Sequence, residues 1–247
     1  MKYPRITSLY KYYACDDRSL SVLANRSFWF AKPDSFNDAL DCNAPFDSNL
    51  NIEDLRRFLP RYKRYRGKEH AENDIQNIID ANGLVKPEFT KIWGDVLKRA
   101  NEDLSNSGVF CLSACNDSIL MWSHYTGNHK GFCVEFVRSP QNELGDYDRT
   151  RKVKYRSDYP SITPLSPKAY DLKFYCKAAA WKYEKEWRLL NKQGDITVPL
   201  SADISVIIFG LRITEEDKSR IRTIMPNVRY CQCTLALNQF GIQIVDV

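Results

Sequence analysis

The stretch GVFCLSACNDSILMWSHYTGNHKGFCVEFV, residues 108–137, contains two apolar runs separated by a polar segment. The runs at 108–114 and 131–137 are rich in β-branched and aromatic residues, which predicts two strands, with Glu135 on the polar side of the second. Asp117 or Ser118 can cap one short helix between them, because either side chain accepts hydrogen bonds from backbone N–H groups. The stretch therefore predicts a strand, a short helix and a second strand.

Similar apolar runs predict further strands on both sides of this stretch. Ser19 and Thr214 are each placed to cap a helix, and AAAWKYEKEWRLL, residues 178–190, predicts a passage from helix to strand. The other predicted strands cover residues 6–12, 28–30, 151–156, 171–175, 204–210, 228–237 and 242–247. Because strands follow one another rather than alternate with helices, we expect an α+β fold with a mixed, mainly antiparallel sheet core.

Residues 51–107 differ in character from the rest of the chain. Their apolar residues recur at spacings of three and four, for example at Phe89, Trp93 and Val96, which predicts amphipathic helices. We therefore expect a single domain, residues 1–247, with a helical insertion at about 51–107. The basic run RYKRYR at 61–66 fits nucleic-acid binding, with bases stacked on tyrosine, but it also fits the solvated face of a helix.

The composition limits the class of protein. The 247 residues carry a formal net charge of +5, and no apolar run approaches the ~20 residues of a membrane-spanning helix. The first residues lack the apolar run of a secretory signal, so we expect a soluble, cytoplasmic protein with no membrane partner and with its eight cysteines reduced. The small positive excess favours an anionic partner such as a nucleotide or a nucleic acid.

The segment MWSHYTGNH, residues 121–129, is the first candidate site. His124 and His129 are five residues apart, which does not match the i, i+4 pair of a zinc helix, so we expect no metal site. A turn at Gly127 that holds His124 and Tyr125 beside aromatic side chains fits a ligand pocket, since imidazole and phenol groups form hydrogen bonds. The same residues fit a capped helix that packs its aromatic side chains into the core.

The segments KYEKEWR, residues 182–188, and FND, residues 36–38, are the other candidates. In an extended chain Glu184, Glu186 and Arg188 share one face, and such a carboxylate can stabilise positive charge on a sugar carbon during glycosyl transfer. A surface strand edge with alternating charges has the same pattern. Asn37 and Asp38 fit either sugar-hydroxyl binding or a turn in which they bond their own backbone.

Four segments together resemble a bacterial family known as domain of unknown function 2971 (DUF2971). They are LYKY at Leu9–Tyr12, the turn at Trp29–Asp38, the central segment Met121–Phe136 and the late segment Lys177–Arg188. The match follows the chain in order over most of its length, apart from 51–107 and the C-terminus. The resemblance implies an uncharacterised bacterial protein from a mobile, toxin or phage-defence region.

The layout is also similar, at the level of the fold, to the ADP-ribosyltransferase superfamily. That resemblance implies an ADP-ribosyltransferase-like enzyme that uses NAD and transfers ADP-ribose to a nucleic-acid or protein acceptor. It implies Glu186 as the carboxylate beside the reacting ribose and Glu184 as the group that orients or deprotonates the acceptor. The other residues that it implies at the site are Tyr10, Lys11, Asn37, Asp38, Trp122, His124, Tyr125 and Arg188, with Trp122 or Tyr125 against the nicotinamide and Lys11 or Arg188 at the diphosphate.

Two other classes of function stay open. A metal-dependent nuclease would use Asp38, Glu184 and Glu186 with Lys182 or Lys185, because acidic and lysine clusters position magnesium and a water. A non-catalytic sensor would bind a nucleotide or a phage component at His124 and Tyr125. The absence of a glycine-rich phosphate loop and of a G-x-S-x-G motif argues against P-loop and Rossmann enzymes.

Overall fold

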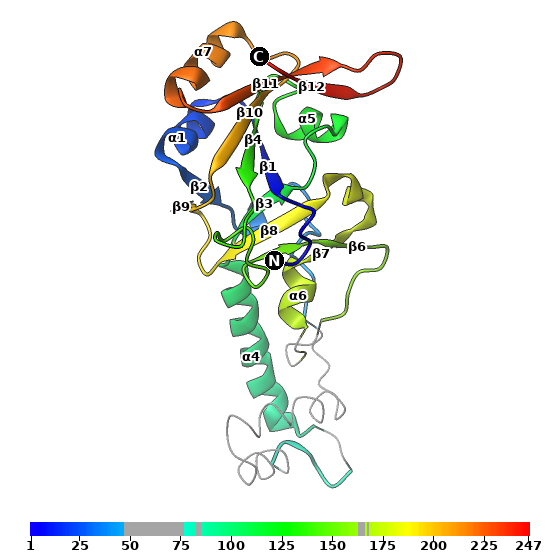
Figure 1. Cartoon of the computed structure of the whole chain (residues 1–247). Helices are drawn as coiled ribbons and strands as arrows, with labels where there is room; N and C mark the ends of the chain where they lie inside the picture. Colours follow the sequence, from blue (N-terminus) through cyan, green and yellow to red (C-terminus); the bar gives the residue numbers. More distant parts are fainter. Residues whose placement is uncertain (47–76, 83–84, 163–165, 167) are drawn as a thin grey trace.

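The structure is a computed structural model that describes residues 1–46, 77–82, 85–162, 166 and 168–247 (Figure 1). Its centre is an eight-stranded sheet, and its strand order is β12 (Ile242–Asp246), β11 (Arg229–Leu235), β10 (Ile204–Phe209), β4 (Phe132–Val137), β1 (Ser8–Tyr13), β3 (Gly108–Ser113), β8 (Glu186–Asn191) and β5 (Thr150–Lys152). Within this sheet β10 and β11 are parallel, and every other neighbouring pair is antiparallel. The predicted α+β class, with a mixed and mainly antiparallel sheet, is confirmed.

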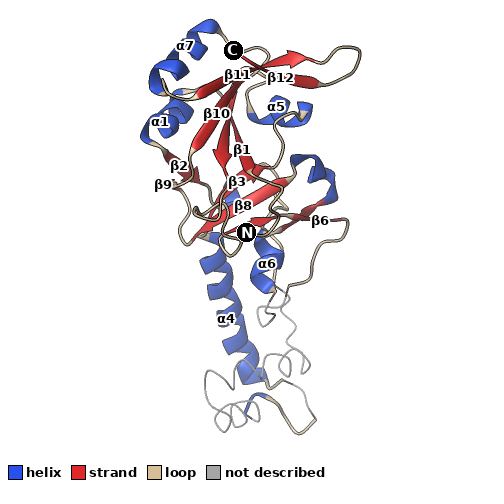
Figure 2. Ribbon diagram, in the orientation of Figure 1, coloured by secondary structure: helices blue, strands red, loops and turns tan. Residues whose placement is uncertain are grey.

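Smaller elements surround this sheet (Figure 2). Two short sheets pair β2 (Ser27–Phe30) with β9 (Ile196–Pro199), and β6 (Lys154–Arg156) with β7 (Cys176–Ala178). The helices are α1 (Asp17–Asn25), α4 (Pro87–Ser105), α5 (Ile119–Tyr125), α6 (Ala169–Phe174) and α7 (Glu215–Ile224), with 3₁₀ turns η1 (Pro33–Ser35) and η2 (Ala179–Glu184). None of the helices in the described part of the chain is long and apolar enough to cross a bilayer.

Two of the predicted local structures are wrong. Residues 171–175 belong to α6 and the residue after it rather than to a strand, since a six-residue segment is too short for its apolar period to decide between the two. Helix α1 begins at Asp17, and its N-cap is Asp16, whose carboxylate accepts a hydrogen bond from the backbone N–H of Ser19. Ser19 therefore lies inside the helix that we expected it to cap.

The capping of α5 and α7 agrees with the sequence. The hydroxyl of Ser118 accepts from the N–H of Met121, and the hydroxyl of Thr214 accepts from the N–H of Asp217. Helix α4 confirms a helix at the end of the segment 51–107. The earlier part of the predicted insertion, including the basic run at 61–66, lies outside the described residues.

Side chains of the sheet alternate between its two faces, and two of the four hydrophobic clusters of the described residues lie on opposite faces of β4. On β4, Phe132, Val134 and Phe136 pack in one cluster with residues of α1, α7 and β2, whereas Cys133 packs on the opposite face with Trp122 of α5. Trp122 is fully buried and its indole N–H donates to the carbonyl of Asn116. Helix α5 is therefore anchored to the sheet by a core residue.

The pairing of β1 differs on its two sides. β1 pairs with β4 over six positions, from Ser8 opposite Val137 to Tyr13 opposite Phe132, but with β3 only at Tyr10 opposite Ser113. Strands β1 and β3 therefore diverge beyond this contact. Side chains from both strands face the space between them, and this divergence positions the site described next.

Candidate functional site

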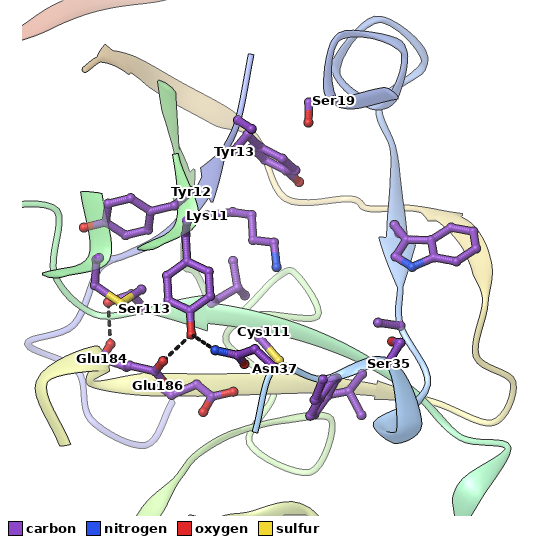
Figure 3. Close-up of a pocket in the computed structure, with 18 of the residues that line it drawn as sticks. Lys11, Tyr12, Tyr13, Ser19, Ser35, Asn37, Cys111, Ser113, Glu184 and Glu186 are labelled. Atoms are coloured by element: carbon purple, nitrogen blue, oxygen red, sulfur yellow. Dashed lines mark hydrogen bonds between the residues drawn. The ribbon is translucent and has the colours of Figure 1, made fainter. Parts of the chain in front are cut away.

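A pocket of about 610 Å³ lies between the diverging strands β1 and β3 (Figure 3). Its walls come from both strands, from α1, β2, η1 and α5, and from the chain around η2 and β8. A volume of this size matches the range of ~300–1,000 Å³ typical of small-molecule sites. Aromatic side chains make up much of the wall, namely Tyr10, Tyr12, Tyr13, Trp29, Phe36 and Tyr125.

One end of the pocket is built on a buried cluster of charges. The ammonium of Lys177 lies 2.6 Å from Glu184, 3.2 Å from Glu186 and 3.2 Å from Asp41. The guanidinium of Arg188 lies 2.6 Å from both Asp41 and Glu186. Three carboxylates therefore share two cations, and the cluster carries a net charge of −1 when all five groups are ionised.

The two glutamates have opposite pKa shifts. Burial raises the pKa of Glu184, and the ammonium of Lys177 offsets this only in part. Burial also opposes the ionisation of Glu186, but the charges of Arg188 and Lys177 outweigh it and lower its pKa to about 2. Adjacent carboxylates with separated pKa values are typical of sites in which one group exchanges protons while the other stays ionised.

Glu184 is linked to the pocket surface through Tyr125 at the end of α5. The hydroxyl of Tyr125 donates to Oε1 of Glu184 at 2.5 Å, and the side-chain amide of Asn37 donates to that hydroxyl at 3.3 Å. Burial and the neighbouring carboxylate raise the pKa of Tyr125, so the phenol keeps its proton and stays a donor. Figure 3 labels Asn37 and Glu184 and draws the hydrogen bonds of the lining residues as dashed lines.

The rest of the pocket has aromatic surface and charges of both signs, since Lys11 and Arg18 line it together with Asp16 and Asp195. Lys11 extends into the pocket from β1, with its ammonium 5.1 Å from the ring centre of Phe110. The guanidinium of Arg18, from α1, lies 4.3 Å from the ring centre of Trp29. Within the described residues neither cation is paired with a carboxylate. Two unpaired cations in one pocket favour an anionic ligand.

Two buried polar atoms of pocket-lining residues have no hydrogen-bond partner. They are the hydroxyl of Tyr13 and Oδ1 of Asp41, whose other oxygen binds Lys177 and Arg188. An unpaired buried polar atom costs roughly 1–3 kcal/mol, so such atoms are usually satisfied by a ligand or a water. The hydroxyl of Tyr13 and Oδ1 of Asp41 are therefore free to form hydrogen bonds with a ligand or a water.

Six of the ten site residues expected from the sequence line this pocket. They come from four distant parts of the chain, namely Tyr10, Lys11, Asn37, Tyr125, Glu184 and Glu186. Glu184 is not part of one strand with Glu186 and Arg188, as we considered, because Glu184 ends η2 and Lys185 adopts a left-handed conformation before β8 begins. Both glutamates are only 3% exposed, so the alternative of a charged surface strand is wrong.

The other four expected residues lie elsewhere. Trp122 is fully buried in the core and cannot stack on a ligand. Arg188 is also fully buried, and its remaining nitrogen donates to Cys42 and to the carbonyl of Phe174, so it cannot meet a diphosphate. Both expected contacts fail because these side chains complete interactions inside the protein.

His124 and Asp38 are displaced from the pocket by local geometry. His124 is exposed, its Nδ1 lies 3.1 Å from the hydroxyl of Tyr183, and it is not among the residues that line the pocket. Asp38 accepts from the backbone N–H of Leu40, which is the turn geometry that we weighed against sugar binding. It lines a separate cavity of about 170 Å³.

The sequence reasoning missed Asp41, Lys177 and Arg18. Lys177 begins the late family motif, and its spacing from the glutamates gives no sign that β7 and η2 bring its ammonium between them. Asp41 lies three residues after Asp38, in the same polar turn. Its acidic side chain so close to a candidate residue was the one sign in the sequence that could have pointed to it. Nothing in the helical pattern of α1 identifies Arg18.

Residues 121–189 match the model of a family described as Protein of unknown function (DUF2971). The matched segment includes Tyr125, Lys177, Glu184 and Glu186, so most of the buried charge cluster lies inside it. The family resemblance expected from the motifs is confirmed over this segment. No curated protein and no solved structure matches the chain.

Proposed function

We propose that this chain, whose residues 121–189 match the DUF2971 model, is a nucleotide-handling enzyme that cleaves the nicotinamide–ribose bond of NAD and transfers the ADP-ribosyl group. The observation that carries the proposal is the arrangement of two carboxylates in one pocket, Glu184 and Glu186, which lie 2.6 Å and 3.2 Å from the same ammonium, that of Lys177. Arg188 also binds Glu186 and keeps it ionised, whereas burial raises the pKa of Glu184. Glycosyl transfer needs both kinds of group at one carbon, a fixed negative charge and a proton acceptor.

The two glutamates take different roles in this reaction. Glu186 remains ionised because Arg188 and Lys177 hold its charge, and it stabilises the positive charge that develops on the ribose carbon. The nicotinamide leaves with the bonding electron pair and becomes neutral. Glu184, a stronger base because of its raised pKa, then accepts the proton of the attacking nucleophile.

The opposite part of the pocket supports an anionic substrate. The unpaired ammonium of Lys11 and guanidinium of Arg18 provide two positive charges for a diphosphate. In this proposal Arg18 contacts the diphosphate, a role that the resemblance implied for Arg188, which is fully buried. Tyr13, with its unpartnered hydroxyl, and the ring of Trp29 offer polar and aromatic contacts for the nucleoside parts.

The metal-dependent nuclease has less support. Lys177 already occupies the position between Asp41, Glu184 and Glu186 in which a divalent cation would be held. Among the residues that the structure describes, no group of three or more histidine, cysteine, aspartate or glutamate side chains could hold a metal ion. A non-catalytic sensor would have no need for two carboxylates of opposite pKa shift, so we favour the enzyme.

The proposal keeps the setting implied by the family resemblance. The reaction would take place in the bacterial cytoplasm, in a toxin or phage-defence context. The eight free cysteines support a reducing compartment, since none is paired with another.

The test is release of nicotinamide from NAD by the purified chain, measured by chromatography with and without a chelator. We expect release that does not depend on a divalent metal and that falls at least about 100-fold in Glu184→Gln, because a general base contributes 10²–10⁴-fold. Glu216→Gln is the matched control, since Glu216 is exposed on α7. Equal rates in Glu184→Gln and Glu216→Gln would remove Glu184 from the mechanism, and metal-dependent cleavage of nucleic acid without NAD would favour the nuclease.

A further inference from the structure

We infer that the acceptor in this reaction is water, so that the chain hydrolyses NAD to nicotinamide and ADP-ribose instead of modifying a macromolecule. The inference rests on the proposed function and adds the identity of the second substrate. It is carried by the burial of the carboxylate end of the pocket and by the unpartnered oxygen of Asp41.

The carboxylate end of the pocket is closed to large acceptors. Glu184 and Glu186 are each 3% exposed and Asp41 is 4% exposed. Both oxygens of Glu184 are already contacted: the hydroxyl of Tyr125 donates to Oε1, and the ammonium of Lys177 donates to Oε2. Because Glu184 is almost fully buried, a protein side chain or a nucleobase finds very little of its surface to contact.

The same end offers a place for a water molecule. Oδ1 of Asp41 is buried and has no partner, although Oδ2 of the same carboxylate is bound by Lys177 and Arg188. The two carboxylates lie close together, because Oδ2 of Asp41 and Oε2 of Glu184 contact the same ammonium, at 3.2 Å and 2.6 Å from the Nζ of Lys177. A water that donates one hydrogen to Oδ1 of Asp41 and the other to Glu184 satisfies the buried acceptor.

A water held in this way is oriented for attack. Both of its hydrogens point to carboxylates, so an oxygen lone pair is left for the ribose carbon. The bond from that carbon to nicotinamide breaks, and the electron pair leaves with nicotinamide. The water oxygen forms the new bond to carbon, one water proton passes to Glu184 and then to solvent, and the products are nicotinamide, ADP-ribose and one proton.

The first experiment follows the fate of NAD labelled in its adenylate phosphate, in the presence of a cell extract as a source of macromolecular acceptors. We expect equal amounts of nicotinamide and free ADP-ribose, with no label retained on protein or nucleic acid. Nicotinamide release with the label on a macromolecule would overturn the inference and leave the proposed function standing. No release of nicotinamide at all would overturn both.

The second experiment tests Asp41 as the positioning residue for water, using methanol as a competing acceptor. Methanol has one hydroxyl proton and needs only Glu184, whereas water uses both carboxylates. In Asp41→Asn the ratio of methyl ADP-ribose to ADP-ribose should therefore rise about three- to tenfold over the wild type, the worth of one hydrogen bond. The matched control is Asp34→Asn, since Asp34 is exposed in η1 and does not line the pocket.

The product ratio separates positioning from stability. A purely structural role of Asp41 would lower both products together and leave the ratio at the wild-type value, which would overturn the assignment of the water site. If Asp41→Asn does not fold, the labelling experiment on the wild-type chain still decides between water and a macromolecular acceptor.

Discussion

Replacing Lys177 by methionine should destabilise the chain strongly, because three buried carboxylates share its ammonium. The side chain is 5% exposed and contacts Asp41, Glu184 and Glu186 at 2.6–3.2 Å. Removing one partner of a buried ion pair costs about 3–5 kcal/mol. Arg188 remains bound to Asp41 and Glu186, so we expect the lower part of this range, about 3 kcal/mol, at neutral pH.

The loss should shrink when the pH is lowered. Without Lys177, Glu184 has no cation beside it, and its pKa rises beyond the already raised value of the wild type. A carboxyl with a folded-state pKa above its unfolded-state pKa destabilises the fold as the pH rises through the folded-state pKa, so acidification restores stability to the variant. Between the unfolded-state and folded-state pKa of Glu184, each unit by which the pH is lowered restores up to about 1.4 kcal/mol of the variant's free energy of unfolding.

The assay is urea unfolding of the wild type, Lys177→Met and Lys182→Met at about pH 8 and about pH 5, just above the usual pKa of a glutamate. Lys182 is the matched control because it lies on η2, is exposed, and should change the free energy of unfolding by less than about 0.5 kcal/mol. A loss below about 1 kcal/mol in Lys177→Met, or a loss that does not decrease at the lower pH, would refute the description of the cluster.

Three further predictions concern the pocket. Lys11→Met should raise the KM for NAD about tenfold or more with little change in kcat, since a charged hydrogen bond is worth about 1.5–3 kcal/mol. The control is Lys130→Met, which should leave KM unchanged because Lys130 is exposed. Equal KM values in the two variants would exclude Lys11 from substrate binding. The rate of NAD cleavage should fall on acidification through the pKa of Glu184, which burial raises above the usual 4.5, and a rate that stays constant to pH 4 would contradict its role as base. Trp122→Phe should lose about 1–3 kcal/mol of unfolding free energy, through the lost bond to Asn116 and a cavity, but keep the wild-type KM, and an altered KM would place Trp122 at the ligand after all.

The sequence predicted the parts of the fold in which local signals agree. The two apolar runs of the segment 108–137 form β3 and β4, and the predicted short helix between them is α5, capped by Ser118. The late passage from helix to strand at 178–190 appears as η2 and β8. These elements are set by apolar pattern and capping, which act over a few residues and can be read from the chain.

The sequence indicated six of the residues that line the pocket, but it could not predict the shape of the pocket, because the shape depends on how distant strands diverge. Tyr10 and Lys11 are neighbours on β1. The sequence does not show that β1 pairs with β3 only at Tyr10 and Ser113, and this short pairing leaves room for the pocket between the two strands. The burial of Arg188 was equally hidden. Arginine is almost never fully buried unless paired, and its partner Asp41 lies 147 residues away in the sequence. Contacts of this range are set by the tertiary fold.

The most direct test of the central claim is a crystal structure of Glu184→Gln with NAD bound. The account predicts NAD between β1 and β3, with its nicotinamide ribose against residue 184 and Glu186 and its diphosphate within hydrogen-bond distance of Lys11 or Arg18. NAD bound at another surface, or a pocket that stays closed to NAD in a variant that folds normally, would contradict it.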